Sequence, residues 1–145
     1  MNDSNRMCQP KSTRAQQIAR AARAFEQRRT GQAPESVNVV LNEDTLVITL
    51  HGALSPAEKV MAKTPEGAAQ VREYHRRLFD SSSDSLRREI KKITGVEVRE
   101  ANVEVEATTG AVVQPLTNGA VVQVFLLARS VPPDAWSERG SDGQS

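Results

Sequence analysis

The spacing of apolar residues predicts a helix near the start of the chain and a β-hairpin after it. From Arg14 to Arg29, apolar side chains recur at helical spacing among Ala, Gln and Arg, which favour helices. Gly31 supplies a stop for this helix. The segments Ser36–Leu41 and Thr45–Leu50 are rich in Val, Ile, Leu and Thr and flank a short polar turn. They predict a hairpin.

Two helix-start patterns predict further helices in the middle of the chain. In Ser55–Glu58, a serine N-cap, a proline at the first helical position and a glutamate three residues after the serine form a capping box. Thr64–Gly67 repeats the start pattern and begins a longer helical stretch. Within it, the polar interval Asp80–Asp84 is either a kink or a weak part of one long helix, and Gly95 ends it.

From Val96 the apolar period changes to two, which predicts strands. Apolar residues fall on even positions up to Val98 and on odd positions from Ala101, so we expect a bulge or break near Arg99–Glu100. The segment Ala120–Ala128 is nearly all apolar, which predicts a final strand covered on both faces.

The word GAVVQ occurs twice, nine residues apart, on either side of a turn. Thr117–Gly119 suits a three-residue hairpin loop, and this register places Pro115 at a sheet edge, where its missing N–H is tolerated. A two-residue loop would cost a ladder hydrogen bond at the proline. We interpret the repeat as two strands that fold back on each other.

The order of elements predicts an α+β fold. An antiparallel sheet of two hairpins, with helices packed on one face, makes a two-layer sandwich in the order α-β-β-α(α)-β-β. We expect one domain over residues 13–129. The polar ends, 1–12 and 130–145, lack apolar periodicity and are predicted to be disordered tails.

Composition excludes several classes of protein. The net charge is +1, so no overall field attracts the chain to nucleic acid or anionic lipid. No apolar run approaches the roughly 20 residues that span a bilayer, and no signal-peptide pattern begins the chain. The single cysteine, Cys8, excludes a disulfide framework and a cysteine-based metal site. We therefore expect a cytoplasmic protein.

The sequence offers little for catalysis. His51 precedes a glycine at a strand-to-helix junction, and His75 lies within a helix, where we expect it on the surface. Ser55 lacks the context of a nucleophile, and its capping role explains it. We predict no catalytic residue, no metal site and no cofactor.

Charge is nevertheless uneven along the chain. The first helix has five arginines against one glutamate, residues 72–92 have seven basic against four acidic side chains, and residues 96–109 are acidic. Solvated surfaces are the simplest interpretation. A nucleic-acid surface is an alternative, although few aromatic residues accompany the basic ones. Self-association or docking on another protein is a third.

Four segments carry a family resemblance. They are PESVNVVLNEDTLVITLHGALSPAE, AKTPEGAAQVREYHRRLF, EIKKITGVEV and NGAVVQVFLL. In this order they resemble the MpsC-like family of the Na+-translocating membrane potential-generating system, over about residues 17–127. The most specific element is LHGALSPAE, in which the family usually has threonine at the Ser55 position.

The resemblance departs from the family pattern in the last hairpin. The family usually has one Thr-Gly turn before its final strand, whereas this chain has two candidates, so Gly110–Asn118 looks like a nine-residue tandem insertion. The resemblance implies a small cytoplasmic protein associated with a membrane system that sustains membrane potential and takes up dissolved inorganic carbon. It implies no set of catalytic residues.

Together these observations predict a non-enzymatic accessory or regulatory binding protein, which forms a homodimer and has a membrane protein as a partner. A small anion such as bicarbonate is a candidate ligand at the helix N-terminus capped by Ser55. The alternative is a nucleic-acid-binding regulator that uses Arg20, Arg23, Arg28 and Arg87–Lys92. The predicted ligand or partner site consists of His51, Gly52, Ser55, Glu58, Arg76 and Arg77.

Overall fold

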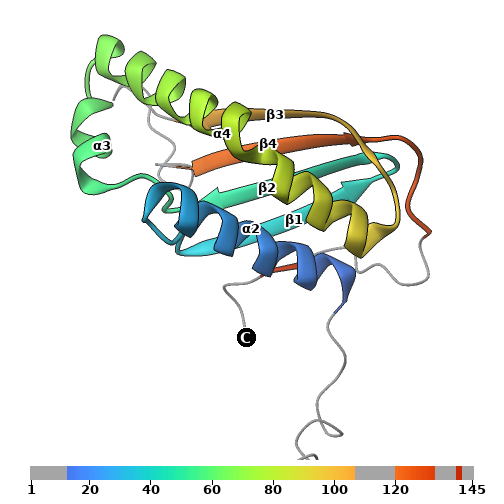
Figure 1. The fold of residues 1–145 in the computed structure, drawn as a ribbon. Helices are drawn as coiled ribbons and strands as arrows, with labels where there is room; N and C mark the ends of the chain where they lie inside the picture. The colour runs from blue at the N-terminus through green and yellow to red at the C-terminus, as the bar shows by residue number, and fades with distance from the viewer. Residues whose placement is uncertain (1–12, 107–119, 133–139, 142–145) are drawn as a thin grey trace, which may run out of the picture.

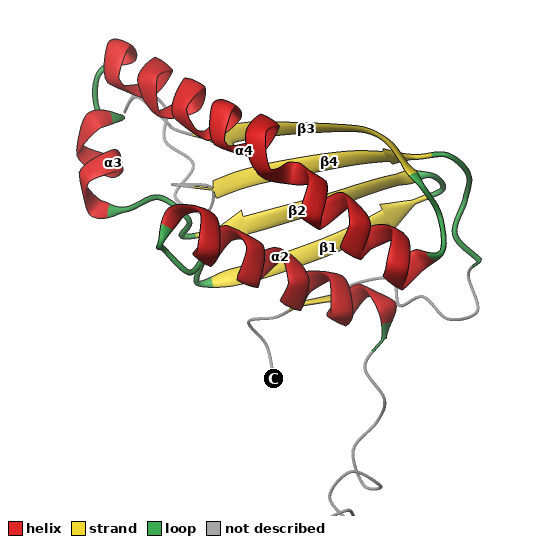
Figure 2. Ribbon diagram, viewed as in Figure 1, coloured by secondary structure: helices red, strands yellow, loops and turns green. Residues whose placement is uncertain are grey.

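Two long helices cover one face of an antiparallel sheet (Figures 1 and 2). A computed structural model describes residues 13–106, 120–132 and 140–141. Helix α2 spans Arg14–Thr30 and helix α4 spans Pro65–Thr94, side by side over the sheet. The short helix α3, Pro56–Met61, lies beside the first turns of α4. The predicted two-layer α+β fold is confirmed.

The last long strand lies inside the sheet, between two other strands. The strands are β1 (Ser36–Asn42), β2 (Thr45–His51), β3 (Val98–Glu106), β4 (Ala120–Leu127) and β5 (Gly140–Ser141). Their order is β3-β4-β2-β1-β5, and every neighbouring pair is antiparallel. Strand β4 therefore joins the first hairpin to β3.

Local sequence signals determine where the helices begin and end. Thr13 and Gln16 form a capping box at the start of α2, with each side chain bound to the other residue's backbone N–H. Gly31 and Gly95 follow α2 and α4 with φ of 80° and 78°, the left-handed conformation that glycine adopts without strain. The predicted ends of both helices are confirmed.

Helix α4 runs without a break through the polar interval Asp80–Asp84. Of the two interpretations, the weak part of one long helix is therefore correct. The hydroxyls of Ser81 and Ser82 donate to the carbonyl oxygen of Leu78 and remain within the helix.

The core lies between the helices and the inner face of the sheet. The Phe79 ring of α4 lies 5.9 Å from that of Phe125 on β4, which fixes how α4 sits on the sheet. The alternation in β2 is confirmed, since Leu46, Ile48 and Leu50 are all buried. Three polar side chains are also fully buried: Glu26, His75 and Gln123.

For the last two long strands, the predicted bulge in β3 is confirmed, whereas the predicted burial of β4 on both faces is not. The register of β3 against β4 shifts between Val98 and Glu100, where the bulge was expected. Strand β4, however, is buried on one face only, and Val122, Val124 and Leu126 on its other face are partly exposed. The prediction of cover on both faces is wrong, because the helices lie on one side of the sheet (Figure 2).

The C-terminal boundary also differs from the prediction of a tail over 130–145. Val131 is buried against the core, and Gly140–Ser141 pairs with Asn38 and Val39 at the edge of β1. The interpretation of the GAVVQ repeat as two strands that pair with each other is wrong. Strand β4 begins in the second copy and pairs with β3 on one side and with β2 on the other. The first copy, the expected three-residue loop, the insertion Gly110–Asn118 and the tail 1–12 lie outside the described residues.

Candidate functional site

The junction between β2 and α3 is built by the predicted capping box. The Ser55 N–H donates to Glu58 Oε1 at 2.8 Å, and the Glu58 N–H donates to Ser55 Oγ at 3.2 Å. Pro56 begins the helix, where a missing N–H costs nothing. These two bonds hold the Glu58 carboxylate at the start of α3.

The same carboxylate reaches across to α4. The His75 Nε2–H donates to Glu58 Oε2 at 2.8 Å, and the His75 side chain is completely buried. The prediction of a surface histidine is therefore wrong. A helical signal was present in the sequence, because Val71, His75 and Phe79 are four residues apart and two of them are apolar.

Glu58 and Ser55 line a cavity with a volume of about 500 Å³. It lies where the end of α2, helix α3 and the first turns of α4 meet. Its lining combines a carboxylate with hydroxyls, amides and apolar side chains: Thr30, Gln32, Ser55, Glu58, Met61, Gln70, Val71 and Tyr74. Two of the six predicted site residues thus line one cavity, and Glu58 also binds His75, a residue that was expected on the surface.

His51 and Gly52 lie apart from this cavity. His51 follows the inward-facing Leu50, so its side chain is on the outer face of the sheet, where Asn38 Nδ2 donates to its Nε2 at 3.1 Å. Gly52 has φ of 66° and turns the chain from β2 towards α3. A Cβ atom there would lie 2.6 Å from Cγ of Glu35. Both residues have structural roles at the junction.

Arg76 and Arg77 extend into solvent and bind Glu73 on the same helix. The Arg77 Nε–H donates to Glu73 Oε2 at 2.9 Å, and Arg76 binds the other carboxylate oxygen. These hydrogen bonds, that of Arg76 first, lower the pKa of Glu73, and the same contact raises the pKa of Arg76. The structure does not bring either arginine into the cavity.

The N-terminus of α3 has little room for the expected anion. The capping box occupies the N–H groups of Ser55 and Glu58, and Pro56 has none. The Glu58 carboxylate is at this helix end, where it would repel a second negative charge. The geometry therefore gives bicarbonate no favourable position beside Ser55.

The basic residues of the nucleic-acid alternative come together in the helix layer. Arg20, Arg23 and Arg28 belong to α2 and Arg87–Lys92 to the adjacent α4. Arg23 Nη2 donates to the carbonyl oxygen of Glu35 at 3.1 Å, so this arginine also has a structural role.

The outer face of the sheet is apolar at its centre, and no described helix covers it (Figure 1). Val40, Val47 and Val124 are opposite each other on β1, β2 and β4 and form a continuous row across the sheet. Val40 is 47 % exposed. On β4, Val122 and Leu126 extend the apolar area on either side of the row. This face and the cavity at Glu58 are on opposite layers of the molecule.

The described part of the chain has neither a cluster of metal ligands nor a membrane-spanning helix. Within 13–106, 120–132 and 140–141, no group of three or more His, Cys, Asp or Glu side chains could hold a metal ion. No helix in this part of the chain is long and apolar enough to cross a membrane.

Comparison with known proteins identifies the family. The family model described as "Na+-translocating membrane potential-generating system (MpsC)" matches residues 10–116 of the 145-residue chain. The chain belongs to the MpsC family. The matched region runs from before α2 to beyond β3 and ends inside the GAVVQ repeat. The predicted MpsC-like resemblance is confirmed.

A curated protein is also similar in sequence to this chain. The chain is 28% identical over 94 residues to "Uncharacterized protein YbcI" of Bacillus subtilis (strain 168), a match that covers 65% of this chain and 76% of the relative. No solved structure matches the chain significantly. The family description links the chain to a membrane-potential-generating system.

Proposed function

We propose that the protein is a non-enzymatic accessory or regulatory component of a membrane-potential-generating system. The description of the MpsC family supports the link to such a system. In this proposal the protein is cytoplasmic and reaches the inner membrane through a membrane-protein partner. It acts through protein contacts and forms a homodimer.

The observation behind this proposal is the outer face of the sheet, which no described helix covers. The row Val40, Val47 and Val124 is apolar surface, exposed at Val40 and partly exposed at the other two residues, and the opposite side of the sheet packs against the helices. Contiguous apolar surface of this kind marks interaction sites in soluble proteins. A binding surface, rather than a reaction centre, is the function that this geometry supports best.

We infer that a second copy of the chain occupies this face. In a two-fold dimer the same face packs on itself, so its rim must be self-complementary. Glu100 and Glu104 lie on β3 at one side of the apolar row, and Asn38 and Asn42 lie on β1 at the other side. When β3 of one copy lies over β1 of the other, carboxylates face amide donors and no glutamate faces a glutamate.

The size of the face predicts a weak dimer. Four strands about 4.8 Å apart, with about six residues of 3.3 Å each, present about 400 Å² per copy. Stable specific interfaces bury about 800 Å² per partner. We therefore expect a dissociation constant on the order of micromolar, so that a larger partner surface can displace the second copy.

Sedimentation velocity across a concentration series tests the dimer. The double variant Val47→Lys, Val124→Lys places two charges at the centre of the face and should remain monomeric at concentrations where the native protein dimerises. Val60→Lys is the matched control, because Val60 is a 62 % exposed valine on α3. Equal dimerisation of the native and doubly substituted proteins would show that the interface is elsewhere.

A tagged pull-down from detergent-solubilised membranes of the host, with and without nuclease, tests the accessory role. Enrichment of one membrane complex, unaffected by nuclease and reduced by the double substitution, is the expected result. Recovery dominated by nuclease-sensitive material would favour the nucleic-acid alternative. Uptake of labelled bicarbonate by cells that lack the gene tests the link to inorganic carbon and should fall.

A further inference from the structure

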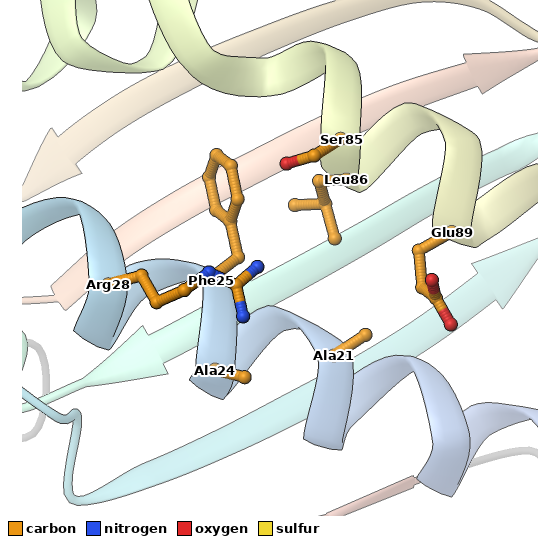
Figure 3. Close-up of a pocket in the computed structure, with 7 residues that line it drawn as sticks. All are labelled: Ala21, Ala24, Phe25, Arg28, Ser85, Leu86 and Glu89. Atoms are coloured by element: carbon orange, nitrogen blue, oxygen red, sulfur yellow. The ribbon is translucent and has the colours of Figure 1, made fainter.

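A groove runs between α2 and α4 on the helix layer, away from both the outer sheet face and the cavity at Glu58. Two adjoining cavities of about 280 and 330 Å³ share Phe25, Arg28 and Ser85 in their lining, so they form one groove. In Figure 3, Phe25 and Arg28 of α2 lie across it from Ser85 and Leu86 of α4. The groove has an apolar floor and polar walls.

The wall contributed by α4 explains a feature of the sequence that helix formation does not. Ser81, Ser82 and Ser85 line the groove, although serine is a poorer helix former than alanine or leucine. Asp80 and Asp84 are two residues before and after Ser82, so they are turned about 160° away from it around the helix. Ser81, Ser82 and Ser85 therefore lie on the side of α4 that borders the groove, and Asp80 and Asp84 lie on the other side.

The wall contributed by α2 contains an arginine whose donors are not all used. The Arg29 side chain is 3 % exposed, its Nη2 binds Glu26, and its guanidinium lies over the Phe25 ring at 5.3 Å. Its Nε and Nη1 atoms are buried and have no hydrogen-bond partner among the described residues. Buried N–H donors are almost always bound, so these two indicate an acceptor beyond the contacts made among the described residues.

The charge balance of the groove favours an anion at one end. Glu26 neutralises Arg29, which leaves Arg28 as the excess positive charge beside the serine hydroxyls. Glu89 lines only the other cavity, where Figure 3 shows it beyond Leu86 and away from Arg28. The serine end of the groove thus combines the Arg28 guanidinium, which forms no ion pair among the described residues, with three serine hydroxyls.

We propose that this end of the groove binds a small oxyanion of the phosphate type. Arg28 supplies the charge, and Ser85 supplies a hydroxyl donor. Ser81 and Ser82 donate to Leu78 in the described state and turn their hydroxyls to the ligand by rotation about χ1. A small rotation of the Arg29 guanidinium brings its Nε–H and Nη1–H groups to the same oxygen atoms, in the fork geometry that suits such anions.

The test is an NMR titration of the ¹⁵N-labelled full-length chain with inorganic phosphate, against sodium chloride at equal ionic strength. Phosphate should produce saturable shifts of the Arg28 and Arg29 side-chain Nε–H signals and of the backbone amides of residues 81–85. Separate titrations with sulfate and with bicarbonate distinguish a preference for a tetrahedral anion from a preference for a planar one. If chloride produced chemical-shift changes equal to those with phosphate, the changes would reflect ionic strength alone, and the proposal would be overturned.

Substitutions locate the site. Arg28→Gln, at an exposed position, should weaken phosphate binding at least tenfold, and Ser85→Asp should abolish the saturable shifts. Arg76→Gln is the matched control, because it makes the same change in charge at a side chain that is 61 % exposed and does not line the groove. Undiminished binding by Arg28→Gln would refute the assignment. The variants leave the outer sheet face intact, so this result and that for the dimer are independent.

Discussion

Gln123 provides a sharp test of the packing of this fold. It lies on the inner face of β4 between Val121 and Phe125, opposite Ile48 on β2 and Val103 on β3. The side chain is fully buried, and neither its Nε2 nor its Oε1 atom has a hydrogen-bond partner among the described residues. An amide in apolar surroundings should therefore reduce the stability of the protein.

The substitution Gln123→Met measures this effect. Methionine has nearly the same length and volume and no branch at Cβ, so it fills the site without a new cavity. Removing an unpartnered buried amide should raise the free energy of unfolding by about 1–3 kcal/mol. At about 4 °C per kcal/mol for a domain of this size, the melting temperature should rise by about 4–12 °C.

Urea unfolding followed by circular dichroism is the assay, because an unchanged m-value shows that the substitution affects stability alone. Gln27→Met, at an exposed position of α2, is the control and should change the free energy of unfolding by less than about 0.5 kcal/mol. A Gln123→Met protein that is no more stable than the native one would refute the reasoning and show that the amide is bound. His75 Nδ1, also buried and unpartnered among the described residues, would be the first group to examine.

Three further predictions concern the α3–α4 end of the molecule and the surface of α4. Gly67→Ala should lower stability by about 1–3 kcal/mol instead of improving the helix, because the new Cβ would lie 1.8 Å from the Met61 carbonyl oxygen; a higher melting temperature would contradict this. Glu58→Ala removes the cap and the partner of His75 and should cost about 2–4 kcal/mol in urea unfolding, whereas Glu58→Gln, which keeps the capping box, should cost less than half as much. The stabilising contact of Glu73 with its two arginines should be present at neutral pH and be lost as the pH falls through the lowered pKa of Glu73; a ¹³C titration of its carboxyl measures this, and Arg76→Gln should raise that pKa.

Much of the fold was predictable because local signals dominate it. The alternation of Leu46, Ile48 and Leu50 and the change of parity after Val98 specify which strand face is buried and where the register shifts. Capping residues and glycines determine the helix ends. Local signals could not decide whether α4 is one helix or two. The serines in its middle disfavour a helix, whereas packing of α4 against α2 and the sheet stabilises the continuous helix.

The candidate site was less predictable because it depends on distant partners. The capping box was a sufficient reason for a glutamate at position 58. No nearby residue in the sequence indicated that its second carboxylate oxygen binds His75 on another helix. The exposure of β4 on one face could not follow from composition either, since an apolar strand is equally consistent with a helix layer or a second protein on its far side. Adjacent basic residues at Arg76 and Arg77 were expected at the site, but helix geometry turns them away from it.

Helix α4 is longer than the strands that it covers, so one end of the molecule extends beyond the sheet. Its 30 residues extend about 45 Å, whereas the eight residues of β4 extend about 26 Å. Figure 1 shows the result, in which the first turns of α4 and the whole of α3 project beyond the ends of the strands. Helix α3 buries none of its residues, so the projecting end opens at a lower free energy than the sheet. We therefore expect hydrogen exchange to be faster in α3 than in the sheet, with the Glu58–His75 contact opposing the opening of this end.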